Sequence, residues 1–384
     1  MHIAVIGFAS NPTITKAGTV SVGGQNVDIY YLLHNLSKTD VAVNYIDTPT
    51  NLDNWRQASE ENLIEALQNY SCFLVDELVE SRYSLVHTCG CEAGMAFMMA
   101  RNIDKNLASL VWVHTNFATL SQRLFVAGEM SWDEVTKSSF YHREMIVNRS
   151  ADHIITGSIS EANELHHIFG IESSKITIVY RGVDHLIFKD RNSFRRLGVI
   201  TSGRMTKRKD FVFFITAIDI ARRKCPNLFP SGSCAIVGGT EEERKALGLQ
   251  PLIHEKQLKN IIKLYDAKSH YQLALTLNRY KVFAGTSRYE TFGLLPLEAR
   301  ACGTPTVLRR NPAYSELPGA RVGGVVVDSD ECEEFADALL KILLLGQEEW
   351  NDLSRKASAT ATGFSWTKYA QEHKAVYEAL LRRY

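Results

Sequence analysis

Short apolar runs alternate along the chain with longer amphipathic segments. In the first half the apolar runs cover residues 3–6, 41–46, 85–87, 110–114 and 153–156, and each has the length of a buried strand. Segments between them, such as 25–36 and 61–79, have the length and polarity of surface helices. Strands that alternate with helices predict parallel sheets built from βαβ units.

The pattern restarts after residue 191. Further strands are predicted at 199–203, 233–237, 261–264, 280–284 and 306–308, with a helix at 211–224. A chain of 384 residues is long enough for two domains. We therefore predict an α/β protein with one doubly wound domain at 1–190, a second at 191–365 and a closing helix at 366–384. Two such domains facing a central cleft would bind ligands outside the carboxyl ends of their strands.

Composition is that of an ordinary globular protein, with 45% apolar and 22% charged residues. Residues 1–7 contain a short apolar run without a basic start or an export cleavage site, and no run approaches the roughly 20 apolar residues that span a bilayer. The seven cysteines include no CxxC pair, which favours a reducing compartment over a disulfide or zinc framework. We expect a cytoplasmic protein without stable membrane association.

Charge is divided unevenly between the halves. Residues 1–190 hold 13 Lys and Arg against 22 Asp and Glu, whereas residues 191–384 hold 30 against 21. The basic second half suits a ligand that carries phosphate. Charge alone would also suit nucleic acid, but no aromatic-basic surface motif accompanies it. We therefore expect no nucleic-acid partner.

The most informative segment is 288–307, where seven residues separate Glu290 from Glu298. A strand-like run precedes it, and Gly303 with Pro305 ends the helix that follows. A strand, a glycine-containing loop and a helix N-terminus together leave backbone N–H groups free to bind oxygen atoms. We place Glu290 in the loop and Glu298 roughly two turns into the helix.

Four other segments end predicted strands or begin helices, as ligand-binding segments do in such sheets. Arg204 and Lys209 follow the first strand of the second domain and could clamp a diphosphate. Gly23 and Gly24 open a helix and would let the backbone approach a ligand. His114 ends a strand and could donate a hydrogen bond to a sugar hydroxyl or shuttle a proton. A tight turn at Gly238 would lie near the base of a nucleotide.

Motifs for other chemistries are missing. The sequence contains no G-x-S-x-G, H-E-x-x-H or G-x-G-x-x-G segment. We therefore expect no protein nucleophile, no catalytic metal, no metal ligands and no resident cofactor.

These segments, in this order, resemble the retaining GT-B glycosyltransferases of family 4. The resemblance covers the whole chain and rests on Gly23-Gly24-Gln25, on residues 151–158 and 179–184, on Ser202-Gly203-Arg204 with Lys209, on the turn at Gly238, on 290–305 and on the helix beginning near Trp366. It implies a closing helix that crosses back to the first domain. It also implies a hexose transfer from a nucleotide-diphosphate sugar to a hydroxyl, with retention and without a divalent metal.

The resemblance also implies roles for particular residues. Glu290 would bind the hydroxyls of the donor sugar, and Glu298 would bind the ribose of the nucleotide. Arg204 and Lys209 would bind the diphosphate. The remaining donor contacts would be Gly24, Gly238, Phe292, Gly293 and Leu294, with His114 touching the donor sugar. Glu290, His114, Arg204 and Lys209 form the expected catalytic set.

The start at Gly23 is most similar to the branch of sucrose-phosphate synthases and inositol-phosphate glycosyltransferases. Those relatives often carry an aromatic residue shortly after the histidine that corresponds to His87, but Thr88 and Cys89 follow it here. Together with the acidic first domain, this favours a neutral or cationic acceptor such as a sugar, cyclitol or aminocyclitol. Its expected contacts are Gln25, Glu92, Asn116 and Arg123.

Two alternative functions remain open. A retaining disaccharide phosphorylase would use the same fold. A two-domain sugar-binding protein without turnover belongs to a different functional class. The donor is expected to be a UDP-sugar, with a GDP-sugar possible, and the protein a monomer or homodimer.

Overall fold

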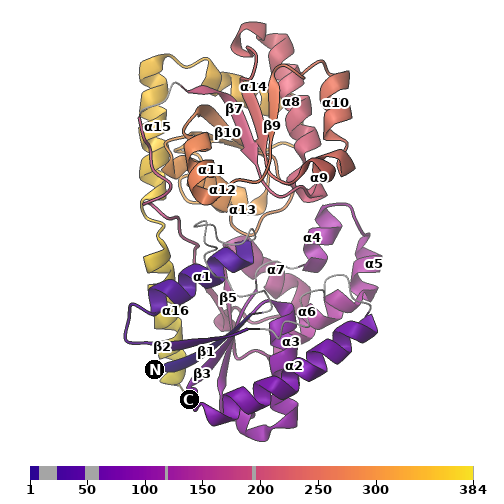
Figure 1. Ribbon diagram of the computed structural model, residues 1–384, viewed down its shortest axis with the longest axis vertical. Coiled ribbons are helices and arrows are strands. Elements are labelled where there is room, and N and C mark those ends of the chain that lie inside the picture. The colour runs from indigo at the N-terminus through magenta and orange to yellow at the C-terminus, as the bar shows by residue number, and fades with distance from the viewer. Residues whose placement is uncertain (8–23, 48–59, 117–119, 193–195, 384) are drawn as a thin grey trace. The chain divides into compact units, whose positions relative to one another are not determined.

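The computed structural model describes residues 1–7, 24–47, 60–116, 120–192 and 196–383. The chain divides into two compact units (Figure 1). The first unit comprises Met1–Gly182 and Trp366–Tyr384, and the second comprises Val183–Ser365. Each unit is an α/β domain of its own.

The first unit is built on a parallel sheet of six strands in the order β2-β1-β3-β4-β5-β6. The strands are β1 (His2–Gly7), β2 (Ala42–Ile46), β3 (Leu85–Cys89), β4 (Val111–Thr115), β5 (His153–Thr156) and β6 (Ile176–Ile178). The strand order reverses beside β1, as in a doubly wound sheet.

Helices cover both faces of this sheet. They are α1 (Gly24–Leu36), α2 (Glu60–Glu80), α3 (Cys91–Ile103), α4 (Leu120–Val126), α5 (Trp132–Lys137), α6 (Ser139–Ser150), α7 (Ile159–Phe169) and α16 (Trp366–Leu381), with short 3₁₀ turns at Lys105–Ser109 and Ser173–Lys175. Alternate strand residues point to opposite faces. Ile6 and Val86 pack into the core with Leu74 of α2 and Phe97 of α3. Figure 1 shows α2, α3 and α6 on one side of the sheet and α1 and α16 on the other.

The second unit also contains six parallel strands, in the order β12-β11-β10-β7-β8-β9. They are β7 (Leu197–Ser202), β8 (Cys234–Val237), β9 (Ile262–Tyr265), β10 (Tyr280–Gly285), β11 (Thr306–Leu308) and β12 (Gly324–Val326). Successive strands run outward in one direction from β7 and in the other from β10. The topological switch point therefore lies between β7 and β10, and ligands bind at such points.

The helical segments of this unit are η5 (Lys207–Lys209), α8 (Phe211–Lys224), η6 (Pro226–Leu228), α9 (Glu241–Ala246), α10 (Leu249–Glu255), α11 (His270–Leu277), α12 (Leu294–Ala301), α13 (Pro312–Glu316), α14 (Cys332–Leu343) and α15 (Gln347–Ala361). The core on one face of the sheet joins Val199 and Val282 to Phe214 of α8 and Phe335 of α14. This packing fixes the start of α8, which follows the loop that carries Lys209.

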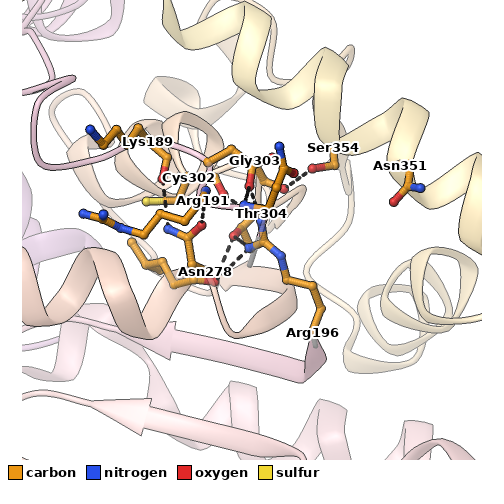
Figure 2. A network of polar contacts seen from close by, with 12 residues as sticks. Lys189, Arg191, Arg196, Asn278, Cys302, Gly303, Thr304, Asn351 and Ser354 are labelled. Atoms are coloured by element: carbon orange, nitrogen blue, oxygen red, sulfur yellow. Dashed lines mark hydrogen bonds and ion pairs between the residues drawn. The ribbon is translucent and has the colours of Figure 1, made fainter. Parts of the chain in front are cut away.

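The chain enters the second unit earlier than the predicted boundary at 190. Val183 pairs with Ser365, and the backbone N–H of Val183 donates to the carbonyl oxygen of Phe364 at 3.3 Å. A polar network then fastens the following segment to the same unit (Figure 2). The side-chain amide of Asn278 donates to the Lys189 carbonyl at 3.0 Å, and Arg196 bonds Asp190 at 2.9 Å. Residues 183–190 therefore belong to the second unit.

Ten of the strands lie where the sequence places them, within one or two residues at each end. The sequence prediction missed β6 and β12. Each is three residues long and lies at the edge of its sheet, so neither carries enough apolar positions to show a period. The predicted helices at 25–36, 61–79, 211–224 and 366–384 correspond to α1, α2, α8 and α16.

Candidate functional site

The loops after β7 and β10 meet at the switch point of the second sheet. The first carries Lys209 and the second carries Glu290, and the Lys209 ammonium group pairs with the Glu290 carboxylate. Further hydrogen bonds join the loops. The backbone N–H of Arg288 donates to the Arg208 carbonyl at 2.8 Å, and the Thr286 hydroxyl donates to the Lys209 carbonyl at 2.9 Å.

Glu290 is a carboxylate at neutral pH. Burial raises its pKa, but the charges of Lys209 and Arg208 outweigh burial and hold the pKa at about 2. An Arg208 nitrogen lies 3.5 Å from one carboxylate oxygen, and the Tyr314 hydroxyl donates to the other at 3.5 Å. Burial lowers the pKa of Lys209, and the Glu290 charge partly offsets this effect.

Glu298 has the opposite protonation behaviour. It lies in the second turn of α12, nearer the helix start than the sequence predicts, and its side chain is buried. Burial raises its pKa to about 8, against a smaller lowering by Lys209. At neutral pH most molecules carry it protonated, so it can both donate and accept a hydrogen bond.

Two glycines shape the backbone of this site. Gly293 precedes α12 with a φ of 102°, in the region that favours glycine. Gly238 follows β8 with a φ of 143°, and a Cβ there would lie 1.9 Å from the carbonyl oxygen of Gly203. Gly238 therefore allows the turns after β7 and β8 to lie in contact. Any side chain at this position would separate them.

The other predicted donor contacts lie on the same loops. Arg204 is exposed on the loop after β7, whereas Phe292 is buried beside Phe364, with ring centroids 6.1 Å apart. Leu294 is half-buried as the first residue of α12. The structure thus places Arg204, Lys209, Gly238, Glu290 and 292–298 on loops and helix starts at the carboxyl edge of one sheet. Their roles in donor binding stay predictions.

Sequence reasoning missed Arg208 and Tyr314, which both contact Glu290. Arg208 could have been noticed, because it is the immediate neighbour of Lys209. Tyr314 lies on α13 and is separated from Glu290 by a helix and a strand. No local pattern connects these two positions.

In the first unit His114 is a neutral, buried residue near the end of β4. Its Nδ1 lies 2.9 Å from the Thr88 hydroxyl, which also accepts a hydrogen bond from the Trp112 indole at 2.8 Å. If the hydroxyl donates to Nδ1, the neutral ring carries its hydrogen on Nε2. Burial lowers the pKa of His114 to about 3. A charged, proton-donating His114 is therefore disfavoured at neutral pH.

One predicted acceptor residue follows strand β4, and the other three lie on helices. Asn116 is buried after β4, and its amide donates to Glu161 at 3.5 Å. Glu92 lies in the first turn of α3 and Arg123 lies on α4. Gly23 lies outside the described residues. Gly24 and Gln25 are the first two residues of α1, and the structure describes only their backbone.

Asn116 belongs to a buried polar cluster. Glu161 accepts a hydrogen bond from the Gly157 backbone at 2.9 Å, and burial raises its pKa to about 8. Arg181 pairs with Asp28 at 2.6 Å, and burial raises the Asp28 pKa to about 6 despite the nearby guanidinium. No local sequence pattern predicts this cluster, because its members lie far apart along the chain.

In a comparison with known proteins, each half of the chain matches a glycosyltransferase family model. Residues 22–185 match the family model described as Glycosyltransferase Family 4, and residues 187–360 match the model described as Glycosyl transferases group 1. Together the two matches span most of the chain. The chain belongs to the GT-B glycosyltransferases of family 4. The predicted family and fold class are confirmed, whereas the position of the two domains about a cleft stays a prediction.

Two curated relatives of this glycosyltransferase are named D-inositol 3-phosphate glycosyltransferase. The protein from Mycolicibacterium paratuberculosis is 28% identical over 316 residues, which cover 79% of this chain and 68% of the relative. The protein from Mycobacteroides abscessus is 25% identical over 413 residues, covering 100% of this chain and 90% of the relative.

Solved structures share the fold. Sucrose-phosphate synthase from Thermosynechococcus elongatus superimposes with a TM-score of 0.80 at 20% identity, over the full length of both chains. Anabaena HepE in complex with UDP gives a TM-score of 0.72 at 17% identity, covering 99% of this chain and 100% of HepE.

No helix in the described part of the glycosyltransferase is long and apolar enough to cross a membrane. Within the same residues, no group of three or more His, Cys, Asp or Glu side chains could hold a metal ion.

Proposed function

We propose that this glycosyltransferase moves a hexose, with retention of anomeric configuration, from a nucleotide-diphosphate sugar to a hydroxyl of a small soluble acceptor. A UDP-sugar is the favoured donor and a GDP-sugar the other candidate. The observation that carries the proposal is the Lys209–Glu290 pair at the switch point of the second sheet, beside a buried Glu298. In this proposal the transfer reaction needs no divalent metal ion.

Cations of the loop after β7 would bind the diphosphate. Lys209 supplies a compact charge and Arg204 a planar fork that matches phosphate oxygens. Both would stabilise the charge that grows on the diphosphate as it leaves. Arg208 would remain on Glu290, from which it lies 3.5 Å away. Glu290 therefore keeps one cationic partner when Lys209 turns to phosphate.

The two glutamates would bind different parts of the donor. Glu290 is anionic and accepts hydrogen bonds, which suits the hydroxyls of a hexose. Glu298 is mostly protonated, so it can accept from one ribose hydroxyl and donate to another. The glycine turns at Gly238 and Gly293 would let backbone groups approach the nucleotide and the sugar.

Bond making and breaking would occur on one face of the sugar. The acceptor oxygen forms its bond to the anomeric carbon while the bond from that carbon to the phosphate oxygen breaks. The proton of the acceptor hydroxyl passes to the departing phosphate oxygen. His114 would orient the donor sugar by a hydrogen bond from Nε2, since its low pKa keeps it uncharged. No protein nucleophile is required.

For the donor, the structures of Anabaena HepE support UDP, because they contain UDP and UDP-glucose. For the acceptor, the named relatives support a sugar or cyclitol. Those names include phosphorylated acceptors. We favour a neutral or cationic acceptor, because the first half carries 22 acidic against 13 basic residues. Its expected contacts are Glu92, Asn116, Arg123 and Gln25.

Release of free nucleoside diphosphate tests the reaction. The purified protein is incubated with UDP- and GDP-hexoses, first alone and then with sugars, cyclitols, aminocyclitols and their phosphate esters. We expect acceptor-dependent UDP release and a product whose anomeric signal in NMR matches the donor. Tight binding of a phosphate ester in titration would contradict the proposed acceptor class.

The same assay separates the alternatives. A disaccharide phosphorylase would consume inorganic phosphate and release no free UDP or GDP. A sugar-binding protein would bind sugar but release no nucleoside diphosphate and form no product. Activity that survives EDTA would support metal independence, and activity restored only by a divalent cation would contradict it.

A further inference from the structure

Asp210 follows Lys209 directly and has an unusual backbone conformation. Its φ of 49° and ψ of 56° lie in the left-handed region, which glycine adopts far more readily than other residues. Aspartate tolerates this region better than most side chains, yet it is held there by its surroundings. The position therefore points to a role for the side chain that glycine could not supply.

The carboxylate of Asp210 is buried and makes three contacts. One oxygen accepts from the backbone N–H of Phe213 at 3.2 Å and caps α8. The other accepts from the Arg288 side chain at 2.8 Å and from Arg309 at 2.7 Å. A single side chain thus satisfies a helix N-terminus and two guanidinium groups.

These partners come from three different segments. Phe213 is in the first turn of α8, Arg288 lies on the loop after β10 two residues before Glu290, and Arg309 follows β11. The Arg309 guanidinium also stacks over the Phe213 ring at 4.0 Å and bonds Asp330 at 2.9 Å. The hub at Asp210 therefore ties the loop that carries Lys209 to the loop that carries Glu290.

We propose that Asp210 is a positioning residue for donor binding, which fixes Lys209 and Glu290 relative to each other through Arg288 and Arg309. This inference rests on the proposed function of the same site. Its carboxylate acts through these partners and need not touch the donor. Charge-assisted hydrogen bonds in a partly buried place are strong enough to restrain both loops.

The test compares two substitutions with a matched control. Asp210→Gly keeps the left-handed backbone free of strain and removes the carboxylate. Asp210→Asn keeps an oxygen that can cap α8 but removes the charge. The control is Asp219→Asn, because Asp219 is a buried carboxylate within α8, paired with Arg222 at 3.0 Å and Arg223 at 2.6 Å.

For Asp210→Gly we expect a donor KM that rises roughly tenfold and a kcat that falls by up to about a hundredfold, since small displacements of positioned groups cost this much. Asp210→Asn should lose less, and the acceptor KM should stay unchanged in both. UDP affinity from titration calorimetry should fall in the same order. Asp219→Asn should lower the melting temperature and leave donor KM and kcat as they are.

Donor kinetics of Asp210→Gly equal to those of the wild type would overturn the inference, as would equal losses in Asp219→Asn. Arg288→Gln keeps the test available if the glycine variant does not fold, because it removes one arm of the hub and leaves the α8 cap. It should raise donor KM, and an unchanged value would count against the hub. A wild-type protein that binds no nucleoside diphosphate would instead overturn the proposed function itself.

Discussion

At the scale of single residues, Glu290 and Glu298 show how surroundings decide chemistry. Both are glutamates of one short segment; Glu298 is buried, and the Glu290 side chain is 11% exposed. Lys209 and Arg208 hold the pKa of Glu290 at about 2, whereas burial raises that of Glu298 to about 8. One is therefore an anion and the other mostly a neutral acid at pH 7. They can serve different groups of one ligand.

Glu290→Gln should impair turnover far more than nucleotide binding. Glutamine keeps the size of the side chain but loses the charge that pairs with Lys209 and would accept from the sugar hydroxyls. We expect kcat to fall on the order of a hundredfold or more, as for removal of other groups that stabilise a transition state. UDP affinity should change little, because UDP lacks the sugar that Glu290 would bind. Steady-state kinetics and UDP titration measure both quantities.

Two further variants make this result specific. Arg204→Ala should lower UDP affinity as well as kcat, because the diphosphate is charged before and during reaction. Glu334→Gln, on the exposed surface of α14, should change neither. Full turnover by Glu290→Gln would refute the assignment of this residue to the transferred sugar.

The sequence could predict where Glu290, Glu298 and Lys209 lie, because each is in a segment with a recognisable local order of strand, loop and helix. It could not predict Tyr314 or the three contacts of Asp210. Those depend on which strands are neighbours, and strand order is a property of the sheet rather than of any segment. The sequence could not predict the pKa values of Glu290 and Glu298 either, since they depend on burial and on partners distant in the sequence.

At the scale of elements, apolar runs sufficed for the central strands and failed at two edges. Central parallel strands are buried on both faces and read as continuous apolar segments. The edge strands β6 and β12 are only three residues long and partly exposed. Their pairing with β5 and β11 defines them, and nothing local does.

The helix α16 is fixed to the first unit by aromatic and histidine side chains. Trp366 stacks on Tyr31 of α1, with ring centroids 4.6 Å apart. The Tyr377 hydroxyl lies 2.6 Å from His87 of β3, and the His373 ring lies 5.7 Å from the His87 ring. Among the described residues, Nε2 of His373 has no hydrogen-bond partner. A buried, neutral histidine therefore lies where α16 meets the sheet.

This histidine should make the first unit sensitive to acid. Burial lowers the pKa of His373 to about 4, so the unfolded chain binds its proton first, near the ordinary value of 6.5. Stability from this residue is complete above pH 6.5 and is lost as the pH falls toward 4. His373→Phe removes the proton site and keeps a ring. The free energy of unfolding of the variant minus that of the wild type should be about 2 kcal/mol larger at pH 5 than at pH 7.5. Denaturant unfolding at both pH values measures this difference.

His167 provides the matched control, because it is an exposed histidine on α7. His167→Gln should leave the pH dependence of unfolding unchanged. The His373→Phe variant should retain some acid sensitivity, since burial also lowers the pKa values of His87 and His114. An identical pH profile for His373→Phe and the wild type would show that His373 titrates alike in folded and unfolded chains.

At the scale of the whole molecule, the two units differ in how the chain builds them. The second unit is one continuous segment, Val183–Ser365, whereas the first needs both ends of the chain. Side chains of α16 that are buried in the first unit include Trp366, Tyr369 and Tyr377. Removal of α16 would expose them and uncover the sheet face around His87. Burial of one aromatic side chain stabilises a fold by several kcal/mol, comparable to the total stability of a domain.

Expressed fragments should therefore behave unequally. The fragment 183–365 should unfold in one cooperative transition and bind UDP, because Lys209, Glu290 and Glu298 all lie within it. It should transfer no sugar, since His114 and the expected acceptor residues belong to the other unit. The fragment 1–182 should show a broad, non-cooperative unfolding curve by circular dichroism. Adding 366–384 through a flexible linker from residue 182 should restore a cooperative transition, whereas a linked segment with Trp366, Tyr369 and Tyr377 changed to alanine should not. Cooperative unfolding of 1–182 alone would show that α16 contributes little to the first unit.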